Sequence, residues 1–180
     1  MTSIQVAIVL AAVLFFWMVG AHNRLVRLRN AISSAWTAFD AQLQRRAVAL
    51  PAMLVPLEAA MPTERPALES VRLAQMQVSQ AAEALQRAPV SADGSATLQV
   101  ALAHLDSALA RMLALLDQHA ELRVLDEVAT AQQEMHDVDL RLAFARQLFN
   151  AASESYNHAL DQFPTRLLAG FFRFLPAGRL

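Results

Sequence analysis

The sequence predicts an all-α protein in which an N-terminal transmembrane helix continues into a long antiparallel four-helix bundle. An apolar run occupies residues 4–21, and beyond it apolar residues recur at steps of three and four. No segment alternates apolar and polar residues as a half-buried strand does. Alanine and leucine dominate the 180 residues, only four of which are glycine, and this composition favours helices.

The apolar run has the length and character of a membrane-spanning helix. Gln5 is its only strongly polar residue. At 1.5 Å per residue the run would extend roughly 27 Å, about the thickness of the hydrocarbon core of a bilayer. A cleaved signal peptide is disfavoured because no basic residue precedes the run. A buried helix of a soluble protein is disfavoured because the run is apolar on all faces. A retained membrane helix is the preferred interpretation.

The charges that follow the run predict its orientation. Arg24, Arg27 and Arg29 come directly after it, and no acidic residue occurs before Asp40. Arginines beside a membrane helix favour the cytoplasmic side. The short N-terminus is therefore expected outside and the bundle in the cytoplasm. The residues predicted to contact the membrane, through interfacial aromatic rings or anionic lipid headgroups, are Trp17, Arg24, Arg27, Phe171, Phe172 and Arg173.

Four apolar stripes define the predicted helices of the bundle. They run over residues 25–61, 68–85, 98–116 and 135–163, with breaks near 61–66, 88–97 and 118–122. Pro51 and Pro56 should bend or end the first helix, and Thr63 is a candidate cap for the second. Pro164 is expected to end or kink the last helix.

Helix lengths predict which segments lie side by side. A helix over residues 23–61 would reach roughly 57 Å from the membrane, and the last helix, 122–163, is long enough to return. Residues 24–39 should therefore lie beside 148–163 near the membrane, beyond the two shorter helices. Apolar residues of such a two-helix surface are incompletely covered, which suggests a partner, a second copy or lipid. Asn150 and Asn157 share one face there, either as inter-helix hydrogen-bonding groups that set register, which we favour slightly, or as solvated groups.

The chain divides into an anchor (residues 1–22), a helical bundle (23–165) and a C-terminal tail (166–180) rich in Phe and Arg. The tail contains the segment LLAGFFRFLPAGRL. Its aromatic and basic residues would suit an interfacial membrane anchor. Packing of the same aromatic rings on the end of the bundle is an equal alternative.

No arrangement of residues indicates catalysis. Cysteine is absent, which excludes thiolate chemistry, and no phosphate-binding, dinucleotide-binding or metalloprotease motif occurs. Glu134, His136, Asp137 and Asp139 are interpreted as a solvated face. The net charge of -1 argues against nucleic-acid binding. We therefore expect no enzyme activity, catalytic residue, cofactor, metal site, small-molecule substrate or nucleic-acid partner.

Two blocks of sequence resemble the LemA family of bacterial membrane proteins: HNRLVRLRNAISSAWTAFDAQLQRR and LRLAFARQLFNAASESYNHALDQFPTRLLAGFFRF. The chain departs from the family pattern at Asp139, Phe149 and Pro56, and residues 63–122 match weakly. The resemblance implies a single-pass N-terminal anchor with a cytoplasmic antiparallel helical bundle. It does not define a biochemical role. The matching residues include Asn23, Leu28, Arg29, Asn30, Trp36, Arg45, Arg46, Arg146, Asn150, Tyr156, Asn157, Phe163 and Pro164.

These observations predict a scaffold or adaptor at the bacterial inner membrane that binds protein partners or a second copy of itself. An envelope sensor or ligand-binding bundle is the alternative, and membrane remodelling through the Phe-rich tail is a variant of the first. The expected interaction surface is the membrane-proximal seam between the first and last helices. Its candidate residues are Arg29, Asn30, Trp36, Arg45, Arg46, Asn150, Tyr156 and Asn157.

Overall fold

The computed structural model describes residues 3–119, 122, 125–163, 165–166, 170, 172 and 174–180. Within this part of the chain there are four α-helices, a short 3-10 turn and no strand, which confirms the predicted all-α fold with its long apolar N-terminal helix. The elements in order are α1 (Ser3–Ala60), η1 (Pro62–Glu64), α2 (Arg65–Arg87), α3 (Ala92–Leu116) and α5 (Asp126–Asp161).

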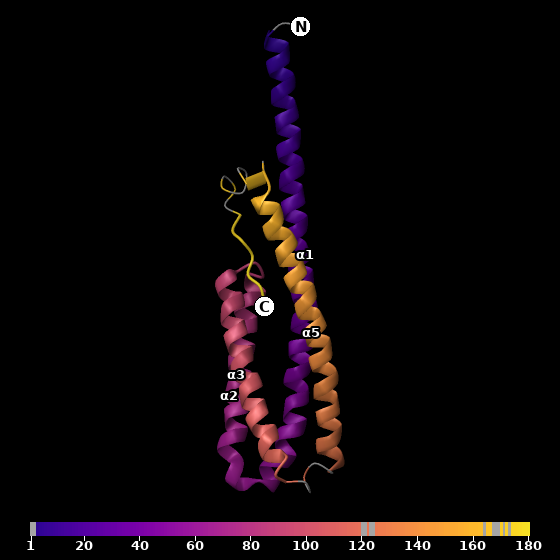
Figure 1. Ribbon diagram of the computed structural model, residues 1–180, viewed down its shortest axis with the longest axis vertical. Coiled ribbons are helices and arrows are strands. Elements are labelled where there is room, and N and C mark those ends of the chain that lie inside the picture. Colours follow the sequence, from indigo (N-terminus) through magenta and orange to yellow (C-terminus); the bar gives the residue numbers. More distant parts are fainter. Residues whose placement is uncertain are drawn as a thin grey trace.

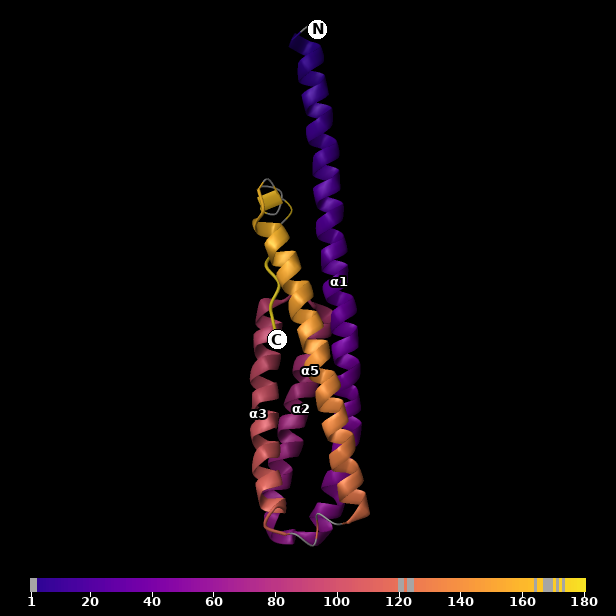
Figure 2. The same cartoon turned by 45° about the vertical axis from the view of Figure 1, so that its right-hand side comes forward.

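The bundle is built from two pairs of helices. α5 runs back along α1, and α3 runs back along α2, and these two pairings have the most extensive backbone contacts (Figure 1). α1 and α2 contact each other less. The α2–α3 pair is shorter than the α1–α5 pair, so that the upper part of α5 lies beside α1 alone (Figures 1 and 2). This arrangement leaves a zone of two helices next to the projecting part of α1, as the helix lengths predict.

α1 continues through both prolines to Ala60, so of the two expected outcomes, a bend or an end, the end does not occur. A proline inside a helix removes one backbone hydrogen bond and costs about 3 kcal/mol. The core residues around Pro51 and Pro56 offset this cost, because the helix can bury them only by continuing. Those residues are Leu50, Met53, Leu54 and Leu57.

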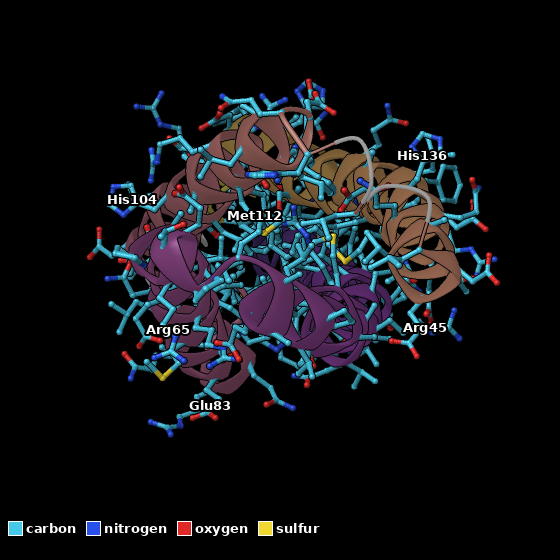
Figure 3. The ribbon with its side chains drawn as sticks, turned by 90° about the horizontal axis from the view of Figure 1, so that it is seen from below. Arg45, Arg65, Glu83, His104, Met112 and His136 are labelled. Carbon is cyan, nitrogen blue, oxygen red and sulfur yellow. The ribbon has the colours of Figure 1, made fainter. Side chains whose placement is uncertain are left out.

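The predicted apolar stripes form the core. On α3 every residue of the stripe from Leu98 to Leu116 is buried, and on α1 the largest buried side chains are Trp36 and Phe39. Met112 points into the core between the helices, whereas charged residues such as Arg45 and Glu83 lie at the periphery (Figure 3). Phe163, expected at the end of the last stripe, is instead 82% exposed because α5 ends at Asp161.

Two helix starts differ from the prediction. α3 begins at Ala92, before the apolar stripe, because the Ser91 side chain accepts a hydrogen bond from the Gly94 N–H at 3.0 Å and caps the helix. Thr63 does not cap α2. It lies inside the η1 turn, and α2 starts behind Glu64 with no side-chain cap.

The first part of α1 projects beyond the bundle as a single exposed helix (Figure 1). Its apolar side chains are open to the surroundings, with Ile4 71% and Phe16 72% exposed. α1 is long and apolar enough to cross a membrane, with a mean hydropathy of 2.4 in its most apolar window and no residue of that window buried. α3 also passes this test on length and composition, but it contributes its stripe to the core of the bundle. The exposed part of α1 is compatible with a membrane anchor.

The end of the tail packs on the bundle. Residues 174–180 run back down between α5 and the upper end of α3, where Ala177 and Leu180 join the hydrophobic core (Figure 1). Packing on the bundle is thus correct for this segment, which we call the seated segment. Leu175 remains 75% exposed. Phe171 and Arg173, two of the predicted membrane contacts, lie outside the described residues.

The core position of Trp36 generates a stability prediction. Trp36→Ala should lower the free energy of unfolding by about 3–5 kcal/mol, because it removes a large buried side chain and leaves a cavity. Phe163→Ala, at an exposed position, should change it by less than about 0.5 kcal/mol. Urea unfolding of the full chain in detergent, followed by circular dichroism, measures both. Equal effects of the two substitutions would contradict the packing described for Trp36.

Candidate functional site

The predicted seam joins residues 24–39, in the middle of α1, with the C-terminal end of α5. The Arg24 guanidinium donates a hydrogen bond to the Gln162 side-chain oxygen at 3.0 Å, just beyond the end of α5. Further down, the Trp36 ring lies 6.1 Å from the Phe149 ring in an edge-to-face arrangement and 5.8 Å from the Phe39 ring. Residues 24–39 therefore lie beside 148–163, as predicted.

Three of the eight candidate interaction residues are core residues and not surface residues, which corrects the prediction. Trp36, Arg46 and Tyr156 are 2%, 5% and 1% exposed. Because these side chains are buried within the bundle, their contacts are with other parts of the same chain and not with a partner. The candidates exposed on α1 are Arg29, Asn30 and Arg45.

Asn150 and Asn157 hold the backbone of the seated segment. The Asn157 side chain donates to the Ala177 carbonyl at 2.9 Å and accepts from the Ala177 N–H at 2.7 Å. Asn150 does the same with the backbone of Leu180, at 2.6 Å and 2.7 Å. The two asparagines are therefore hydrogen-bonded, but to the tail and not to another helix as the register interpretation required.

Two further side chains complete the contacts with the segment. The Tyr156 hydroxyl donates to the Leu175 carbonyl at 3.2 Å, and the Gln99 amide of α3 donates to the Arg179 carbonyl at 3.0 Å. Burial raises the pKa of Tyr156 above its usual value, and the charge of Arg29 opposes that rise. We call the set Gln99, Asn150, Tyr156 and Asn157 the seat. Sequence reasoning missed Gln99, because no local signal marks it.

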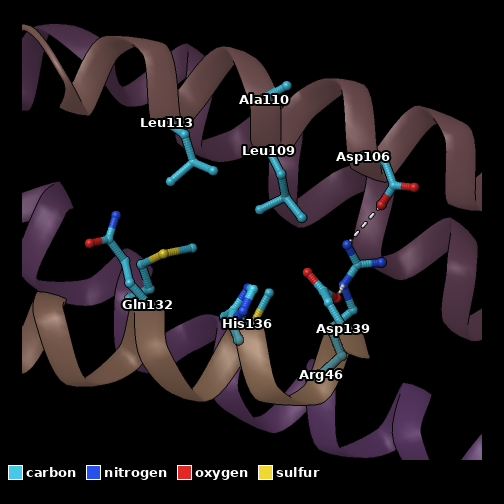
Figure 4. Close-up of a pocket in the computed structure, with 10 residues that line it drawn as sticks. Arg46, Asp106, Leu109, Ala110, Leu113, Gln132, His136 and Asp139 are labelled. Carbon is cyan, nitrogen blue, oxygen red and sulfur yellow. Dashed lines mark hydrogen bonds and ion pairs between the residues drawn. The ribbon is translucent and has the colours of Figure 1, made fainter. Parts of the chain in front are cut away.

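Buried Arg46 links three helices. Its guanidinium lies 2.7 Å from a carboxylate oxygen of Asp106 on α3 and 3.2 Å from one of Asp139 on α5 (Figure 4). The two carboxylates are about half exposed, whereas the arginine side chain is 6% exposed. A charge this deeply buried requires such partners, since removal from water is costly. The ion pair between Arg46 and Asp106 joins the α1–α5 and α2–α3 halves of the bundle.

A cavity of about 430 Å³ adjoins this cluster between α3 and α5. Its walls mix charged and apolar groups, and Figure 4 shows the leucines of α3 facing Gln132 and His136 of α5. Burial raises the pKa of Asp139 above its usual value; the Arg46 charge lowers it, Asp106 raises it further, and His136 lowers it. Among the described residues, no group of three or more His, Asp or Glu side chains is placed to hold a metal ion.

α5 carries a second, outward-facing apolar stripe. Leu140, Phe144 and Leu148 are 60%, 62% and 44% exposed. We call these three residues the ridge. A shallow groove of about 410 Å³ runs beside the ridge, with Ala38 and Gln42 of α1 on its other side. The sequence analysis did not predict the ridge, because the neighbouring stripe from Met135 to Phe163 accounts for the helix. The spacing of four residues between Leu140, Phe144 and Leu148 is the signal that could have found it.

Of the six predicted membrane contacts, the four that the structure describes lie on α1 or against it. Trp17 is 36% exposed on the projecting part of α1, and Arg24 and Arg27 follow it on the same helix. The Phe172 ring, 41% exposed, lies 5.2 Å from the ring of His22. The Phe172 ring thus lies against α1 between Trp17 and Arg24, whereas Trp17 and Arg27 are about 15 Å apart along the helix.

The fold is that of a helical-bundle protein built from two antiparallel helix pairs. Its first helix continues into an exposed apolar segment that is long enough to span a membrane once. The LemA family profile matches residues 35–179, which is most of the chain, and the chain belongs to the LemA family. The match extends into the seated segment. A comparison with curated proteins found no match.

The environment of Asp139 generates a prediction about pH. Because its pKa is raised in the folded protein, folding favours the protonated carboxyl, and its ionisation lowers stability as the pH rises above about 4. Asp139→Asn removes that dependence. The free energy of unfolding of the variant minus that of the natural chain should therefore increase from pH 4 to pH 7, whatever its value at pH 4, as urea unfolding at a series of pH values would measure. A difference that is flat, or that falls with pH, would contradict the burial of this carboxyl.

Proposed function

We propose that this LemA-family protein is a scaffold anchored in the bacterial inner membrane, which binds a second copy of itself and, through the assembled bundles, protein partners. The observation that carries the proposal is the ridge. Large apolar side chains exposed on one face of a well-packed helix lose contact with water when another helix covers them. The groove beside the ridge offers space for side chains of the covering helix.

The arrangement of an anchored pair follows from the membrane. Two copies that share a bilayer through α1 point in the same direction. A two-fold axis relating them then runs along the membrane normal, and each residue of the interface meets its own counterpart. A stripe at steps of four residues is suited to such a contact, because ridges of this spacing interdigitate between helices. Phe144 lies at the centre of the stripe.

The proposed location and orientation are supported by the apolar part of α1 and the arginines after it. The exposed helix from Ile4 onward would be buried in lipid, which removes its apolar side chains from water. Arg24, Arg27 and Arg29 would lie at the cytoplasmic headgroups. The bundle, with the ridge about midway along α5, would then stand in the cytoplasm as a surface for soluble partners.

The cavity beside Arg46 supports a second candidate function, a sensor or ligand-binding bundle. It lies between the two helix pairs, so a bound molecule would contact one half through Arg46 and His136 and the other through Leu109 of α3. Such a role is strongest if the bundle lies outside the cytoplasm, where it would meet envelope signals. The orientation of the chain therefore separates the two functions.

The ridge generates a cross-linking prediction. The chain has no cysteine, so a single introduced thiol reports one contact. Phe144→Cys should give covalent dimers in membranes with a short thiol cross-linker, because each residue 144 faces its counterpart. Met76→Cys is the matched control, since Met76 is 51% exposed on α2, away from the ridge. It should give at least tenfold less dimer.

Equal cross-linking at residues 76 and 144 would indicate random collision and overturn the ridge as a self-association surface. Absence of dimer at both positions would leave binding to other proteins as the remaining form of the scaffold proposal. Proximity labelling from the C-terminus, compared between the natural chain and Leu140→Ser, would then be the deciding measurement. Loss of specific labelled proteins in the variant is the expected result.

The orientation is tested directly by a C-terminal reporter that is active on only one side of the membrane. We expect a cytoplasmic signal from the natural chain. Replacing Arg24, Arg27 and Arg29 with glutamine should weaken that preference, because the basic flank determines the side. An extracytoplasmic signal from the natural chain would contradict the proposed location and place the sensor function first.

A further inference from the structure

The seat binds the tail mainly through its backbone. Asn150 and Asn157 each contact both the N–H and the carbonyl of one residue, as a neighbouring strand would. Gln99 adds a contact to a third backbone group from the opposite side, on α3. Two helices thus present side-chain amides to an extended chain between them. Peptide-binding grooves hold extended segments through main-chain hydrogen bonds in the same way.

The spacing of the asparagines matches the spacing of the groups they bind. Seven residues of α-helix separate Asn150 from Asn157, a rise of about 10.5 Å. Ala177 and Leu180 are three residues apart, and three residues of extended chain cover about 9–10 Å. Residues three apart also share a face in a polyproline II helix. The tail runs antiparallel to α5, since Leu180 lies beside Asn150 and Ala177 beside Asn157.

Side chains restrict what the seat can hold at three positions. Ala177 and Leu180 are buried and must remain small and apolar, respectively. Gly178 passes so close to α3 that an added Cβ atom would lie 2.5 Å from the Ser95 hydroxyl oxygen and 2.8 Å from the Ala92 Cα atom. Any larger residue there would push the segment out. The seat therefore accepts an extended segment of the pattern Ala-Gly-x-Leu.

We propose that the seat is a peptide-binding site which also takes the tail of a second copy, so that neighbouring chains exchange their C-terminal segments. A second copy carries the same Ala-Gly-Arg-Leu segment, which fits the seat as well as the chain's own. This inference rests on the proposed anchoring of copies in one membrane, which holds all seats at one height and keeps the local concentration of tails high.

The length of chain before the segment permits exchange. Twelve residues, 162–173, connect α5 to Phe174. Fully extended they span at most about 40 Å, which exceeds the distance between neighbouring bundles of helices that are each about 10 Å across. A tail that leaves its own seat can therefore reach the seat of an adjacent copy, where it contributes the same hydrogen bonds.

The test uses one thiol on the seat side and one on the tail. Glu154 and Arg179 form an exposed ion pair at 3.7 Å beside the seated segment, so a short bis-maleimide cross-linker can join Glu154→Cys to Arg179→Cys across the space of the two side chains without changing the seat. The two single variants, reconstituted together in lipid vesicles, should form a covalent heterodimer with this cross-linker. A chain carrying both substitutions should also close within itself, which confirms that the cross-linker joins the two thiols.

Gly178→Val in the Arg179→Cys copy is the matched control. It prevents that tail from seating but leaves the seat of the other copy intact, so heterodimer should fall at least tenfold. Closure of the double variant without any heterodimer would overturn tail exchange and leave a strap within one chain. Heterodimer that persists with Gly178→Val would reflect random collision and overturn it as well. If neither the double variant nor the mixture reacts, the seat itself is disproved.

A peptide provides a readout that does not depend on folding of the Gly178→Val chain. With the same cross-linker, the peptide FLPAGCL, which copies residues 174–180 with cysteine at position 179, should become attached to the Glu154→Cys protein faster than FLPAVCL. Equal labelling by both peptides would overturn binding in trans. Repeating the heterodimer experiment with Phe144→Ser in both copies separates the two contacts: exchange should continue when the ridge contact is lost. Suppose that Phe144→Ser abolishes the heterodimer while FLPAGCL still reacts faster than FLPAVCL. That result would overturn tail exchange between membrane copies that are not already paired through the ridge.

Discussion

The close packing of α5 along α1 fixes the positions of the other elements. Its centre is the contact of Trp36 with Phe149, where two large rings fill the space between the helices. α1 continues upward from this contact as an exposed apolar helix. The contact therefore also fixes how far α5 extends toward the projecting part of α1. The shorter α2–α3 pair cannot cover the upper part of the seam. The tail covers it instead, with Ala177 and Leu180 in the core.

Two polar devices connect the halves of the bundle at different heights. Near the middle, buried Arg46 of α1 reaches Asp106 on α3 and Asp139 on α5. Higher up, the seated segment lies between Gln99 of α3 and the asparagines of α5. Both devices satisfy buried or partly buried polar groups, which would cost free energy if left without partners. The two contacts differ in whether a second copy could replace them. Arg46 is part of a packed helix and cannot leave its place, whereas the seated segment is an extended chain that can.

The outward face of the molecule contrasts with these satisfied contacts. The ridge has no covering element among the described residues, and the projecting part of α1 is equally bare. Each is an apolar surface that water alone would surround in an isolated chain. Lipid around α1 and a second bundle on the ridge would remove both surfaces from water. The two forms of burial are compatible, since a shared membrane orients two ridges in parallel.

The sequence by itself determined the helices, their buried stripes and the apolar N-terminal helix, because apolar character and its periodicity are local properties of the chain. It also placed residues 24–39 beside 148–163, since helix lengths follow from residue counts. It could not separate Arg45 from Arg46: the two are adjacent and alike, yet one is exposed and the other buried, because successive helical residues point about 100° apart. Nor could it pair Asn150 with Leu180, thirty residues away in the chain. Only the tertiary structure decided which polar groups meet, because the return of an irregular tail leaves no periodic pattern.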